Sequence, residues 1–71
     1  MIDKYLKALN SKHEMIRQEA LLNIIDVMIE NDWILTLNGN VWDVMPREDF
    51  DPENAESAWE IRNGHFVAYP L

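Results

Sequence analysis

The main helical pattern of the chain runs from Ser11 to Trp33, and the run from Ala20 to Ile29 within it is too long and too apolar for a loop. Ser11 and Glu14 have the S-x-x-E spacing of a capping box, in which two side chains satisfy backbone N–H groups at a helix start. On a helical wheel the polar residues that follow fall in one narrow stripe, made of Glu19, Asn23, Asp26 and Glu30. Because nearly all the remaining arc is apolar, we expect a central helix that is packed on both sides.

A shorter helical pattern comes before the central helix. Apolar residues with the spacing i, i+3, i+4 and i+7 precede Asn10, namely Ile2, Tyr5, Leu6 and Leu9. We expect this first helix to lie against the central helix, and Asn31 to end the latter in a left-handed conformation. Asp26, Glu30 and Asp32 crowd the last two turns, where the helix dipole favours cations. Either a cation from elsewhere in the chain compensates them, or they serve a function.

Asn38-Gly39 separates two β-rich runs, 33–37 and 41–45, and is the strongest short-range signal for a β-hairpin. A type I′ turn on this pair would place Leu35 opposite Trp42. The face expected to cover the helix consists of Trp33, Leu35, Leu37, Trp42 and Val44. The opposite face, expected to contact a partner or a loop, carries Ile34, Thr36, Val41 and Asp43.

A second pair, Asn63-Gly64, predicts a second hairpin near the end of the chain. Its turn would place Ile61 opposite Phe66, and Pro70 is expected to end the last strand. The side chains expected to face the core are Trp59, Ile61, Phe66 and Ala68. Those expected to face outward are Glu60, Arg62, His65, Val67 and Tyr69.

Between the hairpins the chain is acidic and is interrupted by prolines. Asp51-Pro52 resembles an N-cap followed by proline at the first helical position, so we expect a short helix from about Pro52 to Ala58. Phe50 either pins this loop to the core or anchors a partner, and pinning is favoured because a small core needs its aromatic residues. The whole pattern predicts a single small α+β domain over residues 1–71, with two helices packed on an antiparallel sheet of two hairpins, ααββ(α)ββ. A sheet of three strands is the alternative.

The charge is uneven along the chain. Residues 1–17 carry four basic and two acidic groups, or +2, whereas residues 18–71 carry two basic and eleven acidic groups, or −9. Such an acidic body repels phosphate backbones and attracts basic partners. The first seven residues lack the apolar segment of an export signal, and no apolar run is long enough to cross a bilayer. We therefore expect a cytoplasmic protein that binds neither membranes nor nucleic acid directly.

The residues that carry chemistry are few. The sequence contains no cysteine, and its serines and histidines are Ser11, Ser57, His13 and His65. No nucleophile–base pair and no glycine-rich phosphate loop can be assembled from them, so we expect neither catalysis nor a cofactor. Four acids fit positions of an EF-hand count, namely Asp49, Asp51, Glu53 and Glu60. Asn54 replaces the required glycine, so we expect no metal site.

The acidic residues remain as the candidate site. We expect a small non-enzymatic inhibitor whose carboxylates block a basic, nucleic-acid-binding surface of a partner protein. Phage anti-defence proteins, such as anti-CRISPR proteins, and nuclease immunity proteins work this way, and the analogy is one of size and charge alone. The residues expected to bind the partner are Glu19, Asp26, Glu30, Asp32, Glu48, Asp49, Phe50, Asp51, Glu53, Glu56 and Tyr69.

Three alternatives stay open. The acidity can serve solubility alone. The chain can be a structural or adaptor domain that forms a homodimer through the face of Ile34, Thr36 and Val41. It can also be an accessory DNA-binding module, since two helices followed by a hairpin resemble the order of winged helices, with contacts from Lys4, Lys7, Lys12 and Arg17.

Overall fold

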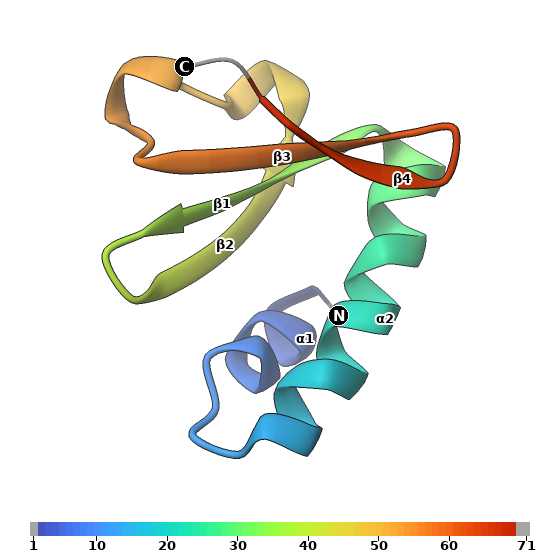
Figure 1. The fold of residues 1–71 in the computed structure, drawn as a ribbon, viewed down its shortest axis with the longest axis vertical. Helices are drawn as coiled ribbons and strands as arrows, with labels where there is room; N and C mark the ends of the chain where they lie inside the picture. The colour runs from blue at the N-terminus through green and yellow to red at the C-terminus, as the bar shows by residue number, and fades with distance from the viewer. Residues whose placement is uncertain (1, 70–71) are drawn as a thin grey trace.

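The computed structural model of the chain describes residues 2–69, and Pro70, predicted to end the last strand, lies outside them. Two helices come first, α1 (Ile2–Leu9) and α2 (Glu14–Asn31). The strands that follow are β1 (Trp33–Asn38), β2 (Val41–Pro46), β3 (Ser57–Arg62) and β4 (His65–Ala68). They form an antiparallel sheet in the order β2-β1-β3-β4 (Figure 1). The predicted α+β architecture of two helices and a sheet of two hairpins is confirmed.

The core lies between α2 and one face of the sheet. Ala20, Ile24 and Met28 follow one another at intervals of four residues on α2, and each is at most 2% exposed. Leu35 of β1 and Val44 of β2 meet them from the sheet, and the end of α1 adds a further buried leucine. Burying one such aliphatic side chain contributes about 1.5–3 kcal/mol. A single stripe of α2 therefore holds the helix to the sheet.

The connection between α1 and α2 differs from the predicted capping box. α2 begins at Glu14, and its N-cap His13 has an extended backbone with no side-chain cap. Ser11 belongs to the end of α1 instead, because its N–H donates to the carbonyl of Ala8 at 3.1 Å. The Ser11 hydroxyl accepts the N–H of His13 at 3.1 Å. Since this turn uses the serine, the capping-box prediction is wrong.

The end of α2 lies one residue later than predicted. Asp32, rather than Asn31, adopts the left-handed conformation (φ 56°, ψ 51°), and its N–H donates to the carbonyl of Met28. Asn31 stays helical, and its Nδ2 donates to the carbonyl of Val27 at 3.0 Å. A short polar side chain tolerates the left-handed region better than an apolar one. The shift places the Asp32 carboxylate beyond the end of the helix, where another segment can reach it.

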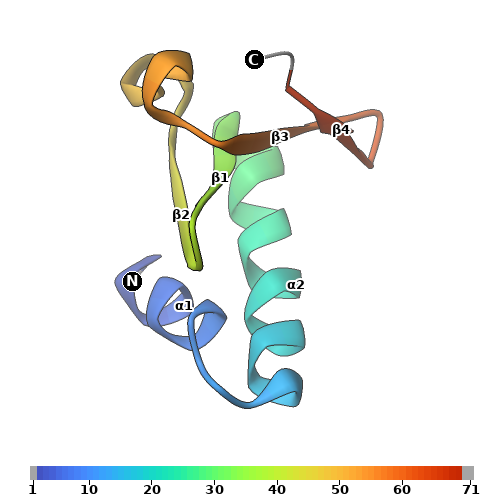
Figure 2. The ribbon, with the colours of Figure 1, turned by 60° about the vertical axis from the view of Figure 1, so that its left-hand side comes forward.

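α2 is packed on one side only, which corrects the expectation of a helix packed on both sides. On its outer side Met15, Leu22 and Ile29 are 82%, 67% and 56% exposed. These residues are seven apart, so they form a nearly straight ridge along the helix. Figure 2 shows α1 and the β1–β2 hairpin on one side of α2, with the opposite side open along most of its length. We call these three residues the outer ridge.

The first hairpin has a different register from the predicted one. Leu35 lies opposite Val44, an offset of two residues. The turn is Gly39-Asn40, and the positive φ of Gly39 (60°) at the first turn position is typical of type II′. Asn38 stays in β1, where its Oδ1 accepts the N–H of Glu56 at 2.7 Å. Because an offset of two keeps every side chain on its side of the sheet, the predicted inner face is still correct.

The second hairpin has the predicted register, with Ile61 opposite Phe66. Both residues of the Asn63-Gly64 turn have positive φ (52° and 79°), as a type I′ turn requires. Three of its side chains do not lie as expected: Glu60, predicted to face water, is 3% exposed, whereas Phe66 and Ala68, predicted to face the core, are both exposed, Phe66 at 42%. β4 is an edge strand whose four residues are all exposed, so it receives less cover than β3.

The loop between the hairpins covers the second face of the sheet. Two 3-10 helices, η1 (Arg47–Asp49) and η2 (Pro52–Asn54), replace the predicted helix from 52 to 58, since the chain enters β3 at Ser57. The predicted N-cap is present, because Asp51 Oδ1 accepts the N–H of Glu53 at 3.0 Å. The order of the elements thus places a polar lid on the side of the sheet away from α2.

This lid changes the interpretation of the predicted dimer face. Ile34 and Thr36 are 0% and 1% exposed, and of the three residues proposed for the interface only Val41 reaches solvent, at 62%. Thr36 borders a small cavity of about 120 Å³ together with Phe50 and other residues of the loop. The prediction of a homodimer through Ile34, Thr36 and Val41 is therefore wrong, because two of these residues are buried within the fold.

Candidate functional site

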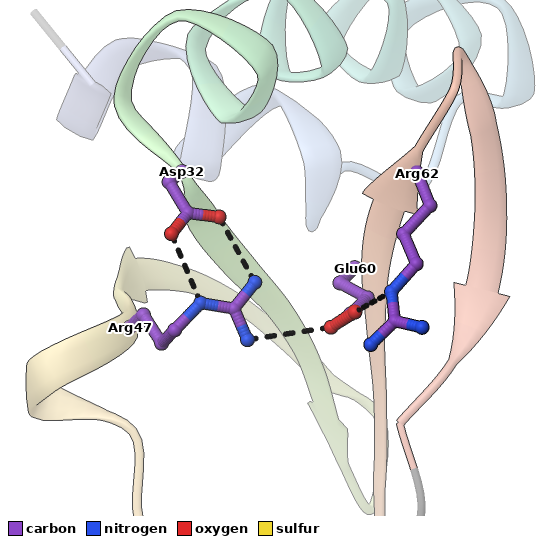
Figure 3. Close-up of polar contacts among 4 residues, drawn as sticks. All are labelled: Asp32, Arg47, Glu60 and Arg62. Atoms are coloured by element: carbon purple, nitrogen blue, oxygen red, sulfur yellow. Dashed lines mark hydrogen bonds and ion pairs between the residues drawn. The ribbon is translucent and has the colours of Figure 1, made fainter.

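Arg47 joins the end of α2 to a buried carboxylate of β3 (Figure 3). Its Nε and Nη2 donate to the two carboxylate oxygens of Asp32 at 3.0 and 2.9 Å. Its Nη1 donates to Glu60 Oε2 at 3.3 Å, and Arg62 Nε donates to Glu60 Oε1. The Glu60 side chain is only 4% exposed, so its charge would be costly to bury without these two guanidinium groups.

The pairing also explains one of the acids at the end of α2. The hydrogen bonds from Arg47 lower the pKa of Asp32 below its ordinary value of 3.8, and the same bonds raise the pKa of Arg47. Both groups therefore stay charged at neutral pH. For Asp32, the expectation that a cation from elsewhere in the chain compensates it is confirmed.

The carboxylates on the outer side of α2 have no such partner. Glu19, Asp26 and Glu30 are exposed in one stripe, as predicted, and none of them takes part in a salt bridge within residues 2–69. The acidic body of the chain has two basic residues, Arg47 and Arg62, and both bind Glu60. The structure thus uses these two cations internally and leaves the stripe on α2 facing water.

The loop acids form a second group on the other side of the sheet. The exposed acids of this group are Glu48, Asp49, Asp51, Glu53 and Glu56. Asp51 caps η2, and Glu56 Oε2 accepts the N–H of Gly39 at 2.9 Å, so these two carboxylates also stabilise the fold. Figure 2 shows the loop and α2 on different sides of the sheet. The structure therefore divides the predicted acidic site into two separate surfaces.

The two aromatic residues of the predicted site contact each other. The rings of Phe50 and Tyr69 pack edge to face with their centroids 4.9 Å apart, and both side chains are half-buried. Such a pair contributes about 0.5–1.5 kcal/mol beyond the area that it buries. Phe50 thus pins the loop, which is the role that the sequence favoured.

Sequence reasoning missed an open apolar groove between α2 and the sheet. The groove has a volume of about 260 Å³ and is lined by Leu21, Leu35, Trp42, Trp59 and Phe66. A second hollow of about 260 Å³ continues it toward the start of α2 and shares Leu21 and Trp42 with it. On the helix surface the outer ridge lies beside these hollows. For the ridge, the seven-residue spacing of Met15, Leu22 and Ile29 was an available signal, and it was hidden because α2 is apolar around most of its circumference.

The described part of the chain offers little support for a metal site, a histidine pair or a membrane-spanning helix. No group of three or more His, Asp or Glu side chains in residues 2–69 is placed to hold a metal ion. His13 and His65 are both exposed and lie on different elements. No helix within the same residues combines the length and the apolar content that crossing a membrane requires.

The arrangement can therefore offer two things to a ligand: an apolar ridge with a groove beside it, and uncompensated carboxylates. Comparison of the chain with protein-family models, with curated proteins and with solved structures gives no match.

Proposed function

We propose that this chain is a small, non-enzymatic inhibitor that acts in the cytoplasm and occupies the basic, nucleic-acid-binding surface of a partner protein. The observation that carries the proposal is that Arg47 and Arg62 both pair with Glu60 of the same chain. Arg47 pairs with Asp32 and Glu60, and Arg62 pairs with Glu60. The stripe of Glu19, Asp26 and Glu30 consequently keeps its full negative charge toward solvent.

A rigid helix is a suitable support for such charges. With a rise of about 1.5 Å per residue, Glu19 and Asp26 lie about 10 Å apart along the axis, and Glu30 lies about 6 Å further. Side chains on a preformed helix lose less conformational freedom on binding than those on a flexible segment. A basic surface that normally follows a phosphate backbone can therefore pair with these carboxylates at a modest entropic cost.

Three carboxylates alone do not reproduce the charge density of a duplex, which is one charge per about 1.7 Å of axis. The loop acids on the other side of the sheet supply the rest of the negative charge that a basic partner would meet. The net charge of −7 acts at a distance and raises the encounter rate with a basic partner. In this proposal α2 makes the contacts and the loop acids contribute chiefly to steering.

The test is an inhibition assay against a panel of nucleic-acid-cleaving enzymes with basic clefts, including RNA-guided nucleases. Cleavage is followed as the chain is added, at about 50 mM and about 300 mM salt, where screening differs strongly. The triple variant Glu19→Lys/Asp26→Lys/Glu30→Lys is compared with its match in the loop, Glu48→Lys/Asp49→Lys/Glu53→Lys, which changes the net charge by the same amount.

We expect the chain to inhibit at least one member of the panel, more strongly at low salt. The α2 triple should lose inhibition by about 100-fold, because direct charge pairs are lost, and the loop triple by about 10-fold or less. An equal loss in the two triples contradicts a binding role for α2. Inhibition of no enzyme, or direct binding of duplex DNA by the chain, contradicts the proposal as a whole and leaves solubility as the reason for the acidity.

A homodimeric adaptor is the second candidate, and the exposure of the outer ridge favours it. It predicts a dimer in sedimentation experiments that is little affected by salt.

A further inference from the structure

We infer that the outer face of α2 binds a basic amphipathic helix of the partner. We call this face, from residue 15 to residue 29, the seam. The inference rests on the proposed function for the sign of the partner's charge. It adds two points to that function: the partner contributes a helix, and apolar contacts hold this helix on α2.

The seam has the pattern of a coiled coil. Met15, Leu22 and Ile29 recur every seven residues, and Gln18 and Ile25 occupy the intermediate positions, three residues after Met15 and Leu22. This is the a/d arrangement with which one helix packs against another. From residue 15 to residue 29 the seam is about 21 Å long, or about four helical turns. Its three a positions are 82%, 67% and 56% exposed in the folded chain.

The groove beside the seam gives a docked helix a second apolar contact. Trp42 and Trp59 form part of its wall, with ring centroids 5.6 Å apart, and Phe66 of the edge strand lines it while 42% exposed. A large apolar side chain of the partner can enter this hollow. A docked helix would therefore cover both the ridge and the groove, as in recognition of an amphipathic helix by an apolar groove.

The chain exposes more surface than is typical of a monomer of its mass. A monomer of 8.4 kDa is expected to expose about 4,600 Å². This chain exposes 5233 Å². The excess of about 600 Å² approaches the area of about 800 Å² that each partner buries in an interface of standard size.

The charges beside the seam select the occupant. Glu19 and Asp26 stand at the e positions, which flank the seam, and flanking charges decide partner choice in coiled coils. A helix with Lys or Arg at its own flanking positions complements them. A second copy of the chain does not, because it also carries −7, and antiparallel pairing of two α2 helices would set Glu19 of one copy near Asp26 of the other. The complementary occupant is a basic helix of a different protein.

The probe for the test is a synthetic peptide of about four turns, with leucine at the a and d positions and lysine at the flanking positions. A second peptide carries glutamate in place of each lysine, and a third has the lysine peptide's composition in scrambled order. Binding is measured from tryptophan fluorescence, because Trp42 and Trp59 line the groove, and by calorimetry. The variant Leu22→Glu is paired with Val41→Glu, which also replaces an aliphatic side chain by glutamate, at a similarly exposed position away from α2, 62% against 67%.

We expect the lysine peptide to bind one to one, and Leu22→Glu to weaken it by about 10-fold or more while Val41→Glu changes it by less than about 3-fold. The glutamate and scrambled peptides should bind about 100-fold more weakly. If the two variants weaken binding of the lysine peptide equally, or if the scrambled peptide binds as tightly as the lysine peptide, the proposed binding at the seam is contradicted. If the wild-type chain is a dimer and Leu22→Glu dissociates it, the occupant of the seam is a second copy of the chain, which contradicts the inference.

The outcomes separate this inference from the proposed function. If reversal of the α2 acids abolishes enzyme inhibition and Leu22→Glu leaves it intact, the inhibitor stands and the seam is refuted. If the lysine peptide binds through Leu22 and no enzyme is inhibited, the seam stands and the choice of a nucleic-acid-handling partner is refuted.

Discussion

The two faces of α2 consist of similar residues with opposite surroundings. The inner face, at most 2% exposed, consists of Ala20, Ile24 and Met28. The outer ridge, at least 56% exposed, consists of Met15, Leu22 and Ile29. Both sets repeat at regular helical intervals. The comparison shows that an apolar pattern identifies the surfaces of a helix that can be buried, whereas the topology of the chain decides which of them its own residues cover.

The largest test of this comparison is the deletion of one aliphatic side chain on each face. Ile24→Ala should lower the free energy of unfolding by about 2–5 kcal/mol, because it leaves a cavity in a fully buried site. Leu22→Ala should change it by less than about 0.5 kcal/mol, because the side chain already contacts water. Urea unfolding measures both values. Similar costs for the two variants would show that the outer face is covered in solution.

The second test compares paired and unpaired charges near the end of α2. Arg47→Ala should cost about 1–3 kcal/mol, because the buried Glu60 keeps only one of its two cations. The figure lies below that for a fully buried pair since the Arg47 side chain is 41% exposed. Asp26→Ala, on the outer face, should cost less than about 0.5 kcal/mol. Thermal and urea unfolding give both numbers, and an Arg47→Ala variant as stable as the wild type would contradict a stabilising role for the ion pairs of Arg47.

The third test concerns the second face of the sheet, where Thr36 borders the loop. Thr36 is 1% exposed, and its Oγ1 has no hydrogen-bond partner among residues 2–69. Thr36→Val should therefore raise the free energy of unfolding by up to about 1 kcal/mol, because it removes an unpaired buried hydroxyl and keeps the shape. Thr36→Ala also removes a methyl group and should lower it by about 1 kcal/mol. A destabilised valine variant would reveal a hydrogen bond to the hydroxyl.

The smallest effect is expected for the acids of the outer face themselves. Glu30 lies in the last turn of α2, where the helix dipole favours a cation, so Glu30→Lys should stabilise the chain by about 0.3–1 kcal/mol. Glu19→Lys, in the first half of the helix, should not. Both variants should weaken binding of the lysine peptide. A stabilising change that weakens binding would indicate that Glu30 is kept for a partner, whereas unchanged binding would assign it to solubility.

Local rules recovered part of the fold from the sequence. The turn and register of the second hairpin were predicted correctly, because Asn63-Gly64 supplies positive φ at both turn positions and no competing pair is adjacent. The first was misplaced by two residues, since Gly39 can serve a turn with either neighbour. The choice depends in part on the bond between Asn38 and the Glu56 backbone, 18 residues away in sequence. A local pattern does not contain that contact.

The candidate site shows the same limit. The stripe of Glu19, Asp26 and Glu30 follows from helical periodicity and was predicted correctly. The sequence indicated that a cation could compensate the acids at the end of α2, but it could not identify Arg47, which reaches Asp32 from 15 residues away. Nor could it show that Ile34 would be fully buried. The apolar groove also requires tertiary structure, because α2 and all four strands contribute its walls.

The most direct test is a titration of the chain with the lysine peptide, followed by methyl NMR. The account predicts that the methyl signals of Met15, Leu22 and Ile29 shift and saturate together at one equivalent. Those of Ile24 and Met28, beneath the helix, should move little. Shifts confined to the loop of residues 47–56, or signals of the outer ridge that already change with the concentration of the chain alone, would contradict it.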